Sequence, residues 1–453
     1  MFRSSRSATV VPILLLGVSY ATLSVAEPVP VPLQNKQKNR FDVSVRTSVS
    51  YTDNRDQIDE SEVARNDQGE LLYKKESSTT FSIGPVFSYE RVIDQRLKLK
   101  TAYSPSYEKE SNPSPGDEDW NWDHYFDFGM EYIFNPRTSM TLKDQFSMTG
   151  ANSYFYGSDY EFDPNRPERL SEDFYENRLS GSVTRLLSTK DSMTLSANWR
   201  IKRYDEKDYA DYRDEDEYGF YVDWMHKAGR HLSYGVFAKY SSWDRENKLL
   251  EVGSQKVDVG LQRLIVGIQG SYDLNGNQDH YIFASFGFNH AWYDDDEQDD
   301  QNQLGDSRLE FRFFQRDPLR VLAGIRYGLD NSDVYPFSSQ QDLASYLNLI
   351  YIFGSNEQYK LSAALEYRLR QYNLLDDLDP SAKSYGYYDA LRERNNGSDD
   401  FDRTSVYFRL SADWKVNEWL TTSAFYSYES VECDIDTDYD ENRLGVSATV
   451  RFL

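Results

Sequence analysis

Strict alternation of apolar and polar side chains is the feature that most constrains the fold of this chain. Residues 359–370 show it clearly, reading Tyr-Lys-Leu-Ser-Ala-Ala-Leu-Glu-Tyr-Arg-Leu-Arg. Successive side chains of a β-strand point to opposite faces, so Leu361 and Leu365 share one face, whereas Lys360 and Glu366 share the other. In a membrane barrel the first face meets lipid and the second meets a wet interior.

Segments with this pattern recur along the whole sequence, from residues 41–51 to residues 442–452, about eighteen times. Bacterial barrels made of one chain have an even number of strands. Two of the segments, 175–187 and 257–272, alternate less regularly, which leaves a range of about 16 to 18 strands. The sequence therefore predicts an all-β fold, a transmembrane antiparallel β-barrel of about 18 strands.

The connections between the segments alternate in length. Those after even-numbered segments are short and rich in turn-forming residues, whereas those after odd-numbered segments are mostly longer and acidic, notably 52–78, 151–174 and 373–403. Outer-membrane barrels have short periplasmic turns and longer external loops, so we expect both chain ends in the periplasm and the acidic loops outside. A soluble β-sandwich or propeller would show this alternation only by chance.

The first 26 residues predict a cleaved secretory signal peptide. Arg3 and Arg6 form a basic start, a short apolar run follows, and Ala26 ends a small-residue cleavage site. The apolar run is shorter than the roughly 20 residues of a membrane-spanning helix. The expected organisation is a signal peptide at 1–26, a short periplasmic segment at 27–40 and the outer-membrane barrel at 41–453.

Acidic residues outnumber basic ones, 75 to 50, and the leader takes two arginines with it, leaving 48 bases and a net charge of -27. Because nucleic-acid binding needs a basic surface, a nucleic-acid partner is excluded. The mean hydropathy of -0.74 is low, but a barrel exposes apolar groups only at every second residue. The 36 Tyr, 25 Phe and 8 Trp suit the bilayer interface.

Residue types that carry catalysis or bind metals form no known motif here. The five histidines accompany no serine nucleophile motif, and the single cysteine, Cys433, cannot form an internal disulfide. The acidic run from Asp434 begins like an EF-hand but has Tyr439 and Gly445 where Gly and Glu are required. We predict a protein that is not an enzyme and has no cofactor, with loose divalent-ion contacts at the acidic loops.

Many predicted inward positions are basic, although the whole chain is acidic. Guanidinium groups bind carboxylate and phosphate in a fixed geometry, so such a wall would suit an acidic solute or polymer. Alternatively, the bases neutralise interior acids such as Glu310, Glu366 and Asp413 across neighbouring strands. Inward aromatics such as Tyr346 either stack on sugar rings or fill space. The candidate pore-lining residues are Lys98, Lys100, Lys143, Arg200, Lys202, Arg308, Arg312, Arg326, Arg368, Arg370, Arg409 and Arg451.

Five short motifs lie in order in the first third of the chain. They are Tyr51-Thr52-Asp53-Asn54, a central Pro85, Tyr103-Ser104-Pro105-Ser106-Tyr107, Asp123-His124 and Asp144-Gln145-Phe146. In this order they resemble the β-barrel porin family of the second type, outer-membrane barrels associated with exopolysaccharide loci. The resemblance implies an exit conduit for polysaccharide, and the family has no catalytic residues to carry over.

The predicted function is therefore an outer-membrane channel that passes hydrophilic solute, with exopolysaccharide export as its setting. The alternatives are a general or anion-preferring diffusion porin and a closed structural or adhesive surface barrel. Expected partners are outer-membrane lipid and lipopolysaccharide, the barrel assembly machinery, an anionic polysaccharide and periplasmic export components. Phe452, penultimate and in phase with the lipid face, is the expected assembly signal. Only about a dozen residues lie between leader and first strand, too few for the plug of an active transporter.

Overall fold

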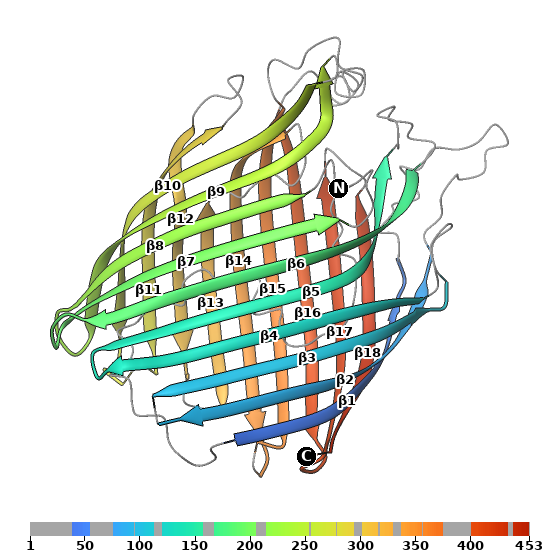
Figure 1. The fold of residues 1–453 in the computed structure, drawn as a ribbon, viewed down its shortest axis with the longest axis horizontal. Coiled ribbons are helices and arrows are strands. Elements are labelled where there is room, and N and C mark those ends of the chain that lie inside the picture. Colours follow the sequence, from blue (N-terminus) through green and yellow to red (C-terminus); the bar gives the residue numbers. More distant parts are fainter. Residues whose placement is uncertain are drawn as a thin grey trace.

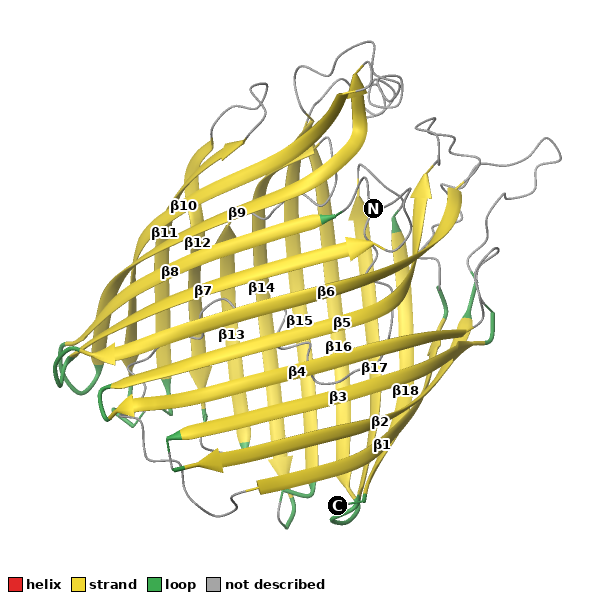
Figure 2. Ribbon diagram, in the orientation of Figure 1, coloured by secondary structure: helices red, strands yellow, loops and turns green. Residues whose placement is uncertain are grey.

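Eighteen antiparallel strands close into one barrel in the computed structural model (Figure 1). Each strand pairs with its neighbours in sequence, and β1 pairs with β18 to complete the ring. Figure 2 shows strands joined by turns and loops, and no helix in the described part of the chain is long and apolar enough to cross a membrane. The structure describes residues 39–54, 76–94, 96–112, 120–156, 167–204, 214–252, 255–277, 279–293, 301–315, 318–328, 337–355, 357–374, 400–433 and 438–452.

The strands are ten to twenty-one residues long. Their bounds are β1 Asn39–Thr52, β2 Ser78–Ile93, β3 Leu97–Glu110, β4 Trp120–Asn135, β5 Thr138–Tyr156, β6 Pro167–Leu186, β7 Asp191–Tyr204, β8 Glu215–Lys227, β9 Leu232–Val252, β10 Gln255–Asp273, β11 Tyr281–Tyr293, β12 Gln301–Phe313, β13 Leu319–Gly328, β14 Phe337–Phe353, β15 Tyr359–Leu374, β16 Asp400–Lys415, β17 Leu420–Cys433 and β18 Tyr439–Arg451.

The predicted fold class is confirmed, with a strand count at the upper end of the expected range. Two hairpins are longer than predicted. The β9–β10 pair continues to Val252 and Gln255, and the β5–β6 pair takes up most of the loop predicted at 151–174. The apolar alternation in β9 ends near Trp243, because a hairpin that rises above the bilayer has no lipid-facing side to cover, while its backbone pairing continues.

Short turns after the even-numbered strands are built by the turn-forming residues that predicted them. The Asn417 Oδ1 accepts hydrogen bonds from the backbone N–H groups of Trp419 and Leu420, at 3.0 and 2.8 Å. Gly354 has a φ of 86° in the β14–β15 turn, a conformation that glycine adopts at little cost. Connections after the odd-numbered strands are mostly longer, with β9–β10 and β17–β18 as exceptions, and they lie largely outside the described residues.

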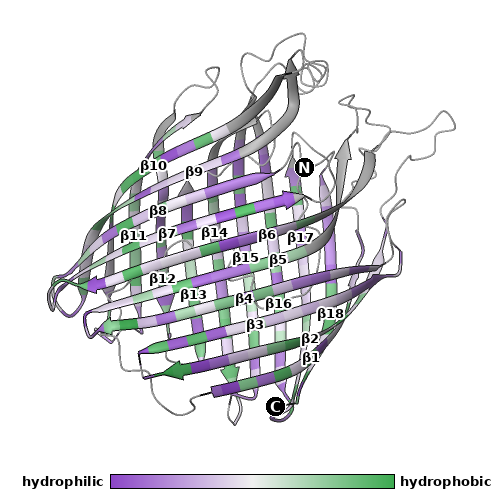
Figure 3. Ribbon diagram, in the orientation of Figure 1, coloured by the Kyte–Doolittle hydropathy of each residue, from purple (hydrophilic) through white to green (hydrophobic). Residues whose placement is uncertain are grey.

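The outer face of the wall is apolar and exposed. Along β10, Leu264, Val266 and Ile268 are 41%, 47% and 61% exposed, whereas Leu261 and Ile265, in the opposite phase, are 4% and 5% exposed. Figure 3 shows the corresponding interchange of hydrophobic and hydrophilic residues along the strands. A closed barrel satisfies all its backbone groups within a bilayer, so this protein is a β-barrel of the outer membrane of a Gram-negative bacterium.

Aromatic side chains form girdles near both ends of the barrel. At the periplasmic end, Phe353 stacks on Tyr351 and on Tyr359 with ring centroids 5.1 Å apart in each pair. Toward the other end, the rings of Tyr107 and Trp122 lie with their centroids 5.4 Å apart, and below them the Tyr103 hydroxyl lies 2.9 Å from the Nδ1 of His124. Each of the five histidines contacts an aromatic ring, which is the position expected for amphipathic rings at a membrane interface.

The seam between β1 and β18 is fastened at its outer end by polar side chains. Asp53 accepts hydrogen bonds from the backbone N–H and the side-chain amide of Asn442, at 2.7 and 2.9 Å. Thr52 donates to Glu441 at 2.6 Å, and the Asn54 amide donates to the Asp440 carbonyl at 2.8 Å. The motif at residues 51–54 therefore helps to close the barrel.

The structure describes little of the predicted segments before the barrel, but it describes the end of the last strand. The signal peptide and most of the predicted periplasmic segment lie outside the described residues, and Asn39 and Arg40 already belong to β1. At the other end, Phe452 donates its backbone N–H to the Val43 carbonyl at 2.8 Å. Its side chain is 60% exposed on the lipid face.

Candidate functional site on the inner wall

All twelve candidate bases lie on one face of the wall, opposite the exposed apolar face. Directly paired residues of antiparallel strands point the same way, so the register carries the assignment from strand to strand. Arg308, Arg326 and Arg368, for example, share one row of paired residues with Ala344. The same tracing places the other nine on the inner face, from β3 to β18.

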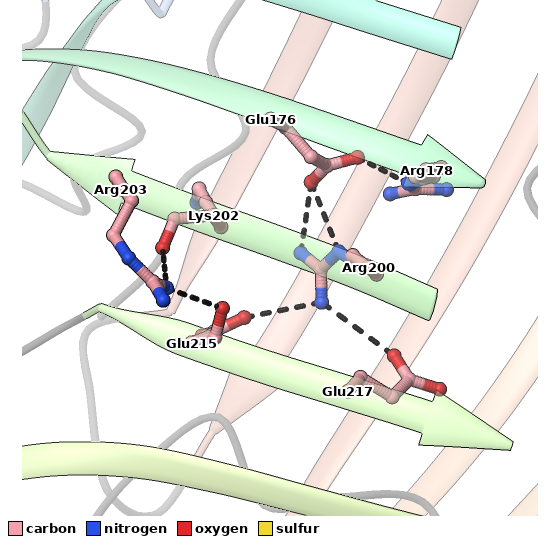
Figure 4. A network of polar contacts seen from close by, with 7 residues as sticks. All are labelled: Glu176, Arg178, Arg200, Lys202, Arg203, Glu215 and Glu217. Atoms are coloured by element: carbon pink, nitrogen blue, oxygen red, sulfur yellow. Dashed lines mark hydrogen bonds and ion pairs between the residues drawn. The ribbon is translucent and has the colours of Figure 1, made fainter. Parts of the chain in front are cut away.

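Arg200 is enclosed by acids from both neighbouring strands (Figure 4). Its guanidinium donates to Glu176 of β6 at 2.9 and 3.0 Å, and it lies 3.1 Å from Glu215 and 3.8 Å from Glu217 of β8. Arg178 also pairs with Glu176. Arg200 therefore ties β6, β7 and β8 together, and its charge is compensated.

A second network occupies the inner face of β12–β15. The Arg312 Nε donates to Glu310 at 2.5 Å, and the Tyr346 hydroxyl donates to the other oxygen of Glu310 at 2.9 Å. Asp342 accepts two hydrogen bonds from Arg368, at 2.7 and 2.5 Å. Two carboxylates of this part of the wall, Glu310 and Asp342, are therefore engaged.

The remaining candidate bases have different kinds of neighbour. Lys98 and Lys100 approach the same carboxylate, Glu90, at 3.4 and 3.8 Å. Arg451 pairs with Asp42 near the periplasmic end. The Lys202 ammonium lies 4.1 Å from the centre of the Phe174 ring, and Arg370 lies directly opposite Arg403 in the ladder.

Four candidate bases have little or no compensation by acids. The Arg308 guanidinium lies 4.6 Å from the centre of the Phe283 ring, and that of Arg409 lies 4.7 Å from the Phe425 ring. Neither these two nor Lys143 forms an ion pair with a described acid. The nearest acid to Arg326 is Asp342 at 4.0 Å. Interior acids therefore neutralise some of the candidate bases, such as Arg200, and leave these four with little compensation.

The uncompensated charge is concentrated on one side of the barrel. On the described inner face of β13–β16, basic residues outnumber acidic ones, whereas the two are balanced on β4–β7 across the lumen. The bases of β13–β16 are Arg320, Arg326, Lys360, Arg368, Arg370, Arg403, Arg409 and Lys415, and its acids are Asp342, Glu366 and Asp413. The acids of β4–β7 are Asp123, Asp127, Glu131 and Glu176, and its bases are Lys143, Arg178, Arg200 and Lys202.

Inward aromatic rings lie against glycines of the wall. A Cβ built on Gly324 would lie 2.5 Å from the Tyr346 hydroxyl oxygen, and one on Gly445 would lie 2.5 Å from the Phe425 ring. Tyr346 is thus held by Gly324 and by its hydrogen bond to Glu310. This arrangement favours packing over sugar stacking for Tyr346.

Sequence reasoning missed two polar groups on the lipid face. Asp144 of β5 and Asn177 of β6 point outward, and the Oδ1 of each is buried without a hydrogen-bond partner in the described structure. The signal was present, because Asp144 is in phase with Leu142 and Phe146. No group of three or more His, Cys, Asp or Glu in the described part of the chain is placed to hold a metal ion.

Comparisons with known proteins give weak similarities. No protein-family model and no curated protein sequence matches the chain. Similar solved structures include the siderophore receptor PirA of Pseudomonas aeruginosa, with 10% identity, a TM-score of 0.43, and coverage of 91% of this chain and 80% of that one.

Two further solved structures show similarity of the same order. The alcaligin receptor FauA of Bordetella pertussis has 11% identity, a TM-score of 0.41, and coverage of 92% and 77%. The FrpB iron transporter of Neisseria meningitidis has 8% identity, a TM-score of 0.49, and coverage of 90% and 64%. Identities and scores this low identify neither a substrate nor a family, and the chain's own strands and outer face identify it as an outer-membrane β-barrel.

Proposed function

We propose that this protein is an outer-membrane channel for hydrophilic solutes that favours anions. The observation that carries the proposal is the excess of basic side chains on the inner face of β13–β16. Charged side chains that line a pore set its ion preference. The negative net charge of the chain does not oppose this preference at the inner wall, because its most acidic stretches fall in the connections that the sequence predicts to be external.

The contacts of individual arginines support the same preference. Arg409 and Arg308 rest on aromatic rings instead of carboxylates, and Arg326 only approaches an acid that Arg368 already binds. Their charges therefore act on the lumen. By contrast, the charge of Arg200 is offset by three acids.

The reversal potential of the purified protein in planar bilayers across a salt gradient tests the proposal. We expect measurable conductance with a potential of the sign that anion permeation gives. The Arg326→Gln/Arg409→Gln variant should lower this selectivity, whereas Arg91→Gln, on the outer face of β2, should leave it unchanged. Cation selectivity of the unmodified protein, or the absence of conductance, would contradict the proposal.

Exopolysaccharide export is the biological setting that we propose for the channel. Its support is the resemblance of the motifs at 51–54 and 103–107 to porins associated with such loci, and the conduit would act without catalysis. Deleting the gene and measuring surface polysaccharide tests the setting. Loss of polymer supports export, whereas unchanged polymer with reduced uptake of small solutes would indicate a diffusion porin. A folded barrel with no conductance would indicate a structural or adhesive role.

A further inference from the structure

Two arginines are placed directly opposite each other on the inner wall. Arg308 of β12 pairs with Arg326 of β13, and the same row continues through Ala344 of β14 to Arg368 of β15. Ladder neighbours lie about 4.8 Å apart, so the three guanidinium-bearing positions fall within about 15 Å. Ala344 contributes only a methyl group between them and has no exposed surface.

Like charges directly opposed in a sheet are unfavourable unless an acid or a bound anion separates them. Two acids of the surrounding strands are already engaged. Asp342 accepts two hydrogen bonds from Arg368, and Glu310 accepts from Arg312 and Tyr346.

Arg326 and Arg308 therefore keep unused hydrogen-bonding capacity. The Arg326 guanidinium comes no closer than 4.0 Å to Asp342, and its buried Nε has no hydrogen-bond partner in the described structure. The Arg308 guanidinium lies over the face of Phe283 and forms no ion pair with an acid in the described part of the chain. The Arg326 side chain is 28% exposed, so its outer nitrogens are within reach of a solute.

We infer that Arg308 and Arg326 form a binding subsite for one oxyanion group, a carboxylate, phosphate or sulfate carried by the solute. The planar guanidinium donates two parallel hydrogen bonds to such groups, and a bound anion would separate the two like charges. Glu366 lies one row toward the periplasm, and its charge opposes tight binding. A solute that passes through a channel must also leave each binding site, so weak binding of this kind suits a channel. The inference rests on the proposed channel, since solute must reach the inner wall.

The subsite is tested by measuring the binding of inorganic phosphate to the folded protein in detergent micelles, with the broadening of the phosphorus NMR line as the signal. We expect saturable broadening and a loss of affinity of about tenfold or more in Arg308→Gln/Arg326→Gln. Lys143→Gln is the matched control, because it removes an uncompensated base from the wall across the lumen. An equal loss in the control, or an unchanged affinity in the double variant, would overturn the subsite.

Single Arg308→Lys and Arg326→Lys variants provide a test that does not depend on the double variant folding. They keep the charge but lose the planar fork, so each should weaken phosphate binding about threefold or more. Full affinity in both would show that charge alone acts and would contradict the subsite. Folding of every variant is checked by the heat-dependent gel mobility of the barrel.

Polygalacturonate and neutral dextran distinguish the source of the anion. Displacement of phosphate by polygalacturonate, but not by dextran, would assign the subsite to polymer-borne carboxylates, whereas phosphate binding alone would assign it to small anions. Measurements of ionic current through the protein separate the two proposals. Phosphate binding by a protein that shows no conductance would overturn the proposed channel and keep the subsite. Conductance that phosphate blocks equally well in the unmodified protein and in Arg308→Gln/Arg326→Gln would overturn the subsite alone.

Discussion

At the scale of the residue, the same side-chain type has different roles on the inner wall, depending on its cross-strand neighbours. Arg200 is held by Glu176, Glu215 and Glu217, whereas Arg409 rests on Phe425. Removing one member of a buried ionic group leaves uncompensated charges, which costs more than the net value of the ion pair. The stability of the wall therefore depends on Arg200 far more than on Arg409.

Replacing Arg200 with Gln should lower the free energy of unfolding by about 3 kcal/mol, because three carboxylates then face one another. Urea unfolding in lipid vesicles measures the change. Lys100→Gln is the control, since its ammonium lies 3.8 Å from Glu90 with both side chains more than 40% exposed, and it should cost about 0–1 kcal/mol. Similar costs for the two variants would contradict this reading of Figure 4.

Replacing Asp144 with Leu should raise the free energy of unfolding. Asp144 lies about 20 Å along β5 from Thr138, and at a typical strand tilt this places it within the apolar band of about 25 Å. Because its Oδ1 is buried and finds no hydrogen-bond partner among the described residues, we expect a gain of about 1–2 kcal/mol. The neighbouring Gln145 donates to Asp127 at 2.9 Å on the inner face, so Gln145→Leu should give no gain. A loss in Asp144→Leu would reveal a partner for Asp144 within the membrane.

At the scale of the strand, the sequence predicts a strand and its two faces only where the bilayer requires apolar side chains on the outer face. The existence and faces of β15 follow from its alternation, because every outward position must meet lipid. The upper part of β9 beyond Trp243 could not be predicted in this way. The pairing of Arg368 with Asp342 depends on the register of β14 and β15, which no local pattern encodes, so the list of inward bases was predictable and their partners were not.

Adding a methyl group at Gly445 of β18 should destabilise the barrel by about 1–3 kcal/mol, because the new Cβ would lie 2.5 Å from the Phe425 ring and 3.0 Å from the Val49 carbonyl. Urea unfolding of Gly445→Ala measures this. Gly129→Ala is the matched inner-face control, since its Cβ meets only the Lys100 side chain at 3.9 Å, and no comparable loss is expected. Phe425→Leu should recover part of the loss at Gly445, and the absence of coupling would contradict the packing of ring on glycine.

At the scale of the whole molecule, closure of the barrel depends on a seam between strands from opposite ends of the chain. Asp53→Ala removes the two hydrogen bonds that the Asp53 carboxylate accepts from Asn442 and keeps the backbone bond from Asp53 N–H to the Asn442 carbonyl. Amide exchange should therefore accelerate in the outer halves of β1 and β18, and the free energy of unfolding should fall by about 1–3 kcal/mol. Hydrogen exchange with mass spectrometry locates the change. Asn121→Ala removes a contact to Asp123 on β4, a strand that takes no part in the β1–β18 pairing, so it should leave the seam protected. Uniform acceleration around the barrel would show that the seam is not a separate point of closure.

The uneven distribution of charge between β13–β16 and β4–β7 acts across the width of the lumen, so it should be sensitive to salt. The screening length is about 10 Å at 0.1 M and about 3 Å at 1 M ionic strength. We therefore expect the anion preference to fall steeply when the same twofold salt gradient is measured near 1 M instead of near 0.1 M. The Arg326→Gln/Arg409→Gln variant, with less charge to screen, should show a smaller fall. An anion preference independent of salt would mean that contacts at close range set the selectivity, and the charge imbalance of the wall would then have no part in it.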